Sequence, residues 1–158
     1  MTSPSQDAGM PSRPENPAAG ALYDAVATEH ATIYGYGVVS AHSVPDVNYL
    51  VSEAMAEHRA RREAAIALME DQGLAAPVPE PGYQMPSEVD TPADATNLAV
   101  RMEEDAAVAW RAVVEQATDQ GVRAFGVTAL TECAVTAARW RAVRGDTKVT
   151  VAFPGGAE

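Results

Sequence analysis

The chain has 158 residues and a formal net charge of −11, with 47% hydrophobic and only 6% aromatic residues. This length is enough for one domain with a substantial core. The negative charge argues against binding nucleic acid or an anionic membrane through a general positive field. A composition rich in alanine and poor in aromatic residues favours closely packed helices over a sheet core.

The cysteine content and the N-terminal sequence point to a soluble, cytoplasmic protein. Cys133 is the only cysteine, so no intrachain disulfide can form, which fits a reducing compartment. Residues 1–15 are polar and rich in serine and proline, without the apolar region of a signal peptide. We expect this segment to be disordered, and no run of the sequence reaches membrane-spanning length.

Four helices are predicted from apolar periodicity and from residues typical of helix ends. Asn16 and Thr91 are the predicted N-caps of the first and third helices, and each is followed by a proline. Gly73 and Gly145 are typical residues to follow the ends of the second and fourth. The expected helices cover about residues 17–42, 46–72, 92–117 and 119–144. The bundle domain then spans 16–145, and 146–158 form a C-terminal tail.

Loop lengths predict how these helices are connected. Two short loops give two antiparallel helical hairpins. The connection over 73–91 contains Pro77, Pro79, Pro81 and Pro86 and cannot be a helix interior. Its 19 or so residues can extend up to ~60 Å, which exceeds the ~39 Å length of a 26-residue helix. We therefore expect an all-α, ferritin-like four-helix bundle, in which one long crossover joins two hairpins.

Each predicted helix places one glutamate on its apolar face. Counted from the two tight turns, the four positions differ in height by about 3 Å or less. We therefore expect a layer of four acids near the middle of the bundle: Glu29, Glu57, Glu103 and Glu132.

A buried layer of carboxylates needs protonation, arginine partners or divalent metal, because desolvating each ion costs several kcal/mol. Arg61 follows Glu57 by one turn, and Arg139 follows Glu132 by two turns. Without metal, we expect one of these arginines to contact Glu57 or Glu132. We also expect at least one glutamate to have a raised pKa.

The crossover, the helix lengths and the four glutamates resemble ferritin-like four-helix proteins over about residues 17–145. Three segments, EHATIYGYG, AEHRARRE and RMEEDAAVAWRAVVEQA, are also similar to a small actinobacterial, mycobacterial-type, ferritin-like family of unknown function. The first resemblance implies a site for two iron or manganese ions, built from glutamates and two Glu-x-x-His pairs. The narrower one implies a fold and hardly any biochemical role.

The sequence departs from that pattern at both histidines. Ala60 and Val135 stand where the third residue after Glu57 and Glu132 should be histidine. His30 and His58 each directly follow a glutamate, which places them at the edge of the predicted core. We regard both as weaker candidate metal ligands and, first of all, as partly buried structural residues.

Three functional hypotheses remain open from the sequence, and none names a substrate or decides whether the chain is an enzyme. The leading one is a binding or assembly protein whose metal centre is degenerate or binds metal weakly. The second is a carboxylate-bridged di-iron or di-manganese protein with ferroxidase-like or oxidase-like chemistry. The third is a non-enzymatic bundle that binds a small ligand at its polar layer.

A homodimer is expected from apolar side chains that one four-helix core does not need. These side chains lie on the first two helices: Tyr23, Tyr34, Val38, Met55, Ile66 and Met69. The crossover offers an alternative cover for this surface, because Leu74, Val78, Tyr83 and Met85 also need a place to pack.

Overall fold

A computed structural model describes residues 9–156 and contains four long helices and one 3-10 turn. In chain order they are α1 (Pro17–His42), η1 (Pro45–Val47), α2 (Asn48–Asp71), α3 (Pro92–Gln116) and α4 (Gln120–Arg144). The part of the chain that is described contains no strand, so the predicted all-α four-helix bundle is confirmed. Among the same residues, no helix has the length and apolar character needed to cross a membrane.

The helix ends follow the local sequence signals. The side chain of Asn16 accepts a hydrogen bond from the backbone N–H of Ala19, and Thr91 forms a reciprocal capping box with Asp94. Gly145 ends α4 with a φ of 90°, a left-handed conformation that glycine adopts without steric cost. These caps satisfy backbone groups that a helix leaves unpaired at its ends.

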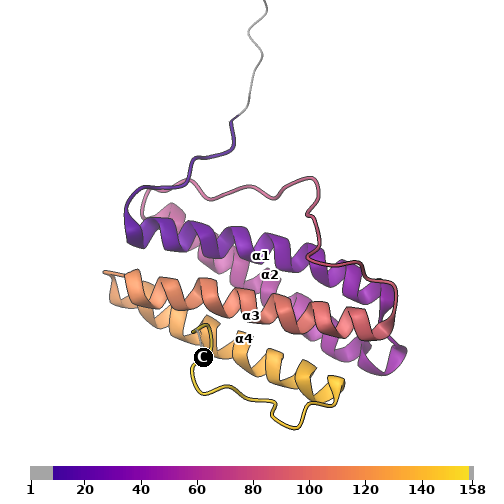
Figure 1. Cartoon of the computed structure of the whole chain (residues 1–158). Coiled ribbons are helices and arrows are strands. Elements are labelled where there is room, and N and C mark those ends of the chain that lie inside the picture. The colour runs from indigo at the N-terminus through magenta and orange to yellow at the C-terminus, as the bar shows by residue number, and fades with distance from the viewer. Residues whose placement is uncertain (1–8, 157–158) are drawn as a thin grey trace, which may run out of the picture.

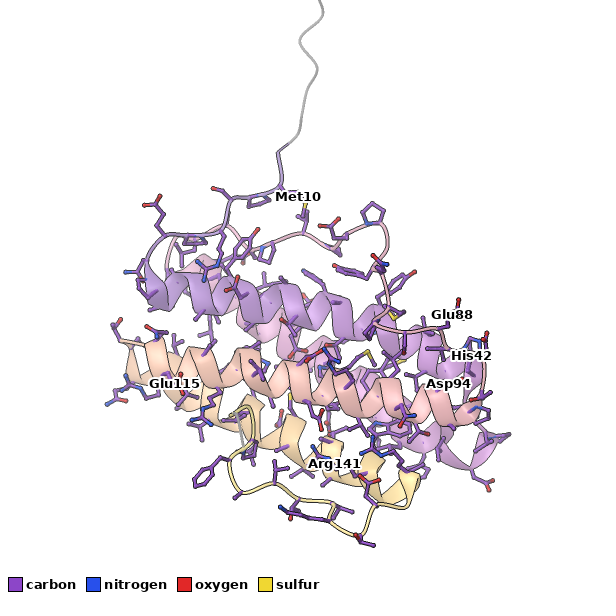
Figure 2. All side chains as sticks on the ribbon, in the orientation of Figure 1. Met10, His42, Glu88, Asp94, Glu115 and Arg141 are labelled. Carbon is purple, nitrogen blue, oxygen red and sulfur yellow. The ribbon has the colours of Figure 1, made fainter. Side chains whose placement is uncertain are left out.

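The long crossover carries the chain along the outside of α1 to the opposite end of the bundle (Figure 1). His42 and Asp94 consequently lie at the same end, with Glu115 at the other, so α3 runs antiparallel to α1 (Figure 2). Helix α1 packs against both α2 and α3, and α3 packs against α4, whereas α2 and α4 touch only slightly. This arrangement leaves the side between α2 and α4 relatively open.

The crossover and the N-terminal segment cover part of the surface that we expected to be free for a dimer. The rings of Tyr83 and Tyr34 are in tilted contact with centroids 5.4 Å apart, and Met69 is fully buried. The hydroxyl of Tyr23 donates to the carbonyl of Pro11. The crossover therefore packs against part of this face, and Tyr34 remains 44% exposed there. We expected residues 1–15 to be disordered, and of these, residues 1–8 lie outside the described residues.

Two apolar clusters fill the bundle, one toward each end. Leu22 and Val26 of α1 contribute to one cluster and Tyr36 and Val39 to the other. Along α2 and α3 the same division falls on either side of His58 and Glu103. A polar layer therefore separates the two clusters near the middle of the bundle.

Candidate functional site

The helix faces that point inward decide which charged residues reach this polar layer. On α2 the buried side chains recur every three or four residues: Val51, Ala54, His58, Arg61, Ala65 and Met69. Glu57 lies beside this face and is exposed. On α4 the inward position belongs to Cys133, and Glu132 lies at the surface. The predicted layer of four buried glutamates is therefore wrong at Glu57 and Glu132.

Glu29 and Glu103 are the two predicted acids that are buried, each with 0% exposure. His58 lies between them, although the sequence placed it at the edge of the core. Its Nδ1 donates to Glu29 Oε2 over 2.6 Å, and its Nε2 donates to Glu103 Oε1 over 3.0 Å. One imidazole from α2 therefore bridges a carboxylate of α1 and a carboxylate of α3.

Arg61 adds a second cation one turn further along α2. Its Nη1 donates to Glu29 Oε1 over 3.3 Å, and its Nη2 donates to Glu132 Oε2 over 2.9 Å. This contact meets the expectation that either Arg61 or Arg139 contacts Glu57 or Glu132. The same Nη1 lies 3.0 Å from Nδ1 of His58. Because both groups are donors, that contact sets like charges side by side, and the carboxylate of Glu29 binds both of them.

Three aromatic side chains complete the network. The indole of Trp110 donates to Glu29 Oε1 over 2.7 Å. The hydroxyl of Tyr36 donates to Glu103 Oε1, and Tyr36 in turn accepts a hydrogen bond of 2.9 Å from the indole of Trp140. Buried tyrosine and tryptophan side chains normally need a polar partner of this kind. These aromatics therefore hold both carboxylates in fixed orientations.

The pKa values follow from the balance between burial and these contacts. Burial alone would lower the pKa of His58, but the hydrogen bonds that it donates to its two carboxylate partners raise the pKa to about 9. Burial would raise the pKa of Glu29, but the contacts with His58, Arg61 and Trp110 together outweigh it and the pKa is lowered. Our expectation of a raised glutamate pKa is wrong at this residue. At neutral pH, His58 is an imidazolium facing an ionised Glu29.

The remaining predicted site residues lie outside this network. Arg139 pairs with Glu53 over 2.6 Å rather than with Glu57 or Glu132. His30 is buried, and its Nε2 lies 3.0 Å from the carbonyl of Pro77, so it ties the crossover to α1. Cys133, which was not a predicted site residue, is fully buried and accepts a hydrogen bond of 3.4 Å from Nη1 of Arg61, and burial raises the pKa of its thiol. A buried thiol with a raised pKa is unreactive.

The side-chain atoms of the network that lack a hydrogen-bond partner do not form a metal site. Among residues 9–156, no group of three or more His, Cys, Asp or Glu side chains is arranged to hold a metal ion. Glu103 Oε2 and Arg61 Nε are buried and have no hydrogen-bond partner. The first is a single carboxylate oxygen, and the second is a donor on a permanent cation. The network therefore retains little capacity to coordinate a cation.

Sequence reasoning missed the roles of Tyr36, Trp110 and Trp140, but a signal for the inward faces was available. Along α4, Val122, Gly126, Ala129, Cys133, Thr136 and Trp140 recur at regular intervals of four and three residues. The stripe through Glu132, with Phe125, Ala129 and Thr136, has the same spacing but contains a charged residue. Choosing the stripe without a charged residue would have placed Cys133 inside and Glu132 at the surface.

Comparison with solved structures finds a close relative of this chain. The crystal structure of a conserved hypothetical protein from Mycobacterium tuberculosis is 53% identical in sequence and superposes with a TM-score of 0.80. The similarity covers 82% of this chain and 98% of that protein. No curated protein matches the chain.

A family model matches residues 21–158, which include all of α2, α3 and α4 and most of α1. The matched region contains every residue of the His58 network. The biochemical role of this family is unknown, and the description of the mycobacterial relative names no activity. The chain belongs to the family described as Domain of unknown function (DUF4439).

Proposed function

We propose that this chain is a ferritin-like bundle in which two protein cations, His58 and Arg61, take the place of a central di-metal site. In this proposal it works as a binding or assembly protein rather than as an enzyme. The observation that carries the proposal is the bridge made by His58, whose two ring nitrogens are both bound by buried carboxylates.

Charge balance supports this proposal. Glu29 and Glu103 carry two negative charges, and His58 and Arg61 carry two positive charges, so the buried cluster is neutral without any metal. Neutral, hydrogen-bonded clusters avoid the large cost of an uncompensated buried charge. Glu132 lies at the surface end of Arg61, where water solvates its carboxylate.

The residues present do not fit the iron or manganese pair that the ferritin-like resemblance implies. Ala60 and Val135 stand at the two expected histidine positions, and Glu57 is exposed. The guanidinium of Arg61 lies 3.3 Å from Glu29, where it would repel a metal cation. Among the described residues, the unpartnered Oε2 of Glu103 and Nδ1 of His30 are the buried atoms that favour a metal-binding alternative.

A role without catalysis is supported by the burial of the network. Glu29 and Glu103 have no exposed surface, and His58 is 1% exposed. A general acid or base must come within hydrogen-bond reach of the group on which it acts, and these side chains are sealed from solvent. We also retain a cytoplasmic location and membership of an actinobacterial ferritin-like family as parts of this proposal.

Metal analysis tests the proposal. Protein purified without chelator should contain far less than one iron or manganese per chain, and its thermal unfolding should be unaffected by EDTA. About two such ions per chain, as in di-metal bundles, would contradict the proposal if they were lost in Glu103→Ala. The matched control is Glu57→Ala, which removes an exposed glutamate from the neighbouring helix.

A further inference from the structure

The outer face of α4 is uncharged along its length. Its side chains recur every three or four residues: Ala124, Thr128, Thr131, Val135, Ala138 and Ala142. All but Ala138 are exposed, and Val135 at the centre is 55% exposed. This spacing is the seam with which one helix packs against another.

The exposed face of α2 offers a contrast, since it carries Glu53, Glu57, Glu63 and Glu70 together with Arg59. Two copies of a chain with a net charge of −11 repel each other at acidic surfaces. The stripe on the outer face of α4 carries no charged side chain, so that repulsion is weak there. A second copy of this chain can therefore approach there.

An apolar groove of ≈ 530 Å³ lies beside this face. One wall is α4, with Leu130, Ala134 and Val135. The other wall is the C-terminal tail, which Arg141 holds through a hydrogen bond of 3.0 Å to the carbonyl of Val149. Arg141 lies between α4 and this tail in Figure 2. The face thus combines an uncharged helix seam with an adjoining apolar hollow.

We propose that this face binds a second copy of the chain, with the two α4 helices antiparallel about a two-fold axis near Val135. Glu132 and Arg139 lie on the same edge of the face, two helical turns apart, on either side of Val135. An antiparallel arrangement about this axis sets Glu132 of each copy beside Arg139 of the other. This pairing of opposite charges across the two-fold axis favours the antiparallel arrangement.

Both edge residues retain surface for a second partner. The side chain of Glu132 is 47% exposed beside Arg61, and the side chain of Arg139 is 37% exposed beside Glu53. The dimer goes beyond the proposed function and does not depend on what occupies the centre of the bundle. The proposed interface on α4 also differs from the α1 and α2 surface on which the sequence led us to expect a dimer.

Light scattering over a dilution series tests the dimer. The wild-type chain should have a mass of about twice 16.6 kDa at high concentration. Val135→Lys should weaken association at least ten-fold, because it introduces an unpaired charge at the centre of the seam. Val78→Lys is the matched control, since Val78 is 48% exposed on the crossover. A wild-type monomer, or equal affinities for both variants, would overturn the proposal.

Crosslinking gives a second readout, and its cysteine variants introduce no charge that could disturb folding. Cys133 is buried and is the chain's single cysteine, so an introduced cysteine reports its own surroundings. Mild oxidation should convert Val135→Cys to a disulfide-linked dimer and leave Val78→Cys largely monomeric. Equal crosslinking of the two variants would overturn the location of the interface even if the chain is a dimer.

Discussion

Replacing Arg61 by alanine should destabilise the fold far more than replacing Arg139. Both arginines make an ion pair between α2 and α4, at 2.9 Å to Glu132 and at 2.6 Å to Glu53. They differ in burial, because Arg61 is 5% exposed whereas Arg139 lies at the surface. The pair of substitutions therefore compares the same chemistry inside and outside the core.

The magnitude for Arg61→Ala follows from the contacts that are lost. Removing one partner of a buried ion pair costs about 3–5 kcal/mol. Glu29 keeps His58 and Trp110 as hydrogen-bond donors, so we expect the lower part of this range, about 3–4 kcal/mol. Arg139→Ala removes an exposed pair, which is worth about 0–1 kcal/mol.

Urea unfolding followed by circular dichroism measures both values as changes in the free energy of unfolding. For a domain of this size, the Arg61 variant should also lose roughly 6–16 °C in melting temperature. A difference between the two variants of less than about 1 kcal/mol, the value of an exposed pair, would refute the reasoning. It would mean that Arg61 does not neutralise the core carboxylates.

Two further predictions concern the pH dependence of stability and the effect of replacing two glycines by alanine. The pKa of His58 is about 9 when folded and 6.5 when unfolded, so its contribution is complete below pH 6.5 and is lost as pH rises through about 9. The free energy of unfolding should fall by up to about 3 kcal/mol over this range. Urea titrations should show this decline vanish in His58→Gln but persist in His42→Gln. A Cβ at Gly35 would lie 2.1 Å from Sδ of Met102, whereas one at Gly37 would meet nothing within 4 Å. In thermal unfolding, Gly35→Ala should lower the stability by about 1–3 kcal/mol and Gly37→Ala should raise it by up to about 1 kcal/mol; the same sign for both would contradict this packing.

The order of the helices could be predicted because their signals are local. Asn16, Thr91 and Gly145 act at the helix ends through caps and turns that need no tertiary information. The proline-rich connection and the short turns restrict the topology in the same way. The observed helix bounds consequently fall close to those expected from the sequence.

The polar layer could be predicted only in part, because it depends on helix rotation. Glu57 and His58 are neighbours in sequence, and a helix turns about 100° between adjacent residues. Assigning the inward face one residue too early therefore exchanges an imidazole for a carboxylate at the centre of the bundle. The partners of Tyr36 and Trp110 lie 67 and 81 residues away in sequence, and no local pattern encodes such pairs.

The charge state of His58 tests the central claim most directly. Side-chain ¹⁵N NMR of the wild-type chain at neutral pH should show an imidazolium with both ring nitrogens protonated, each donating to a carboxylate. The signal should titrate near pH 9, well above the ordinary value of 6.5. A neutral imidazole at pH 7, or ring-nitrogen shifts characteristic of a bound metal, would contradict the replacement of a metal centre by His58 and Arg61.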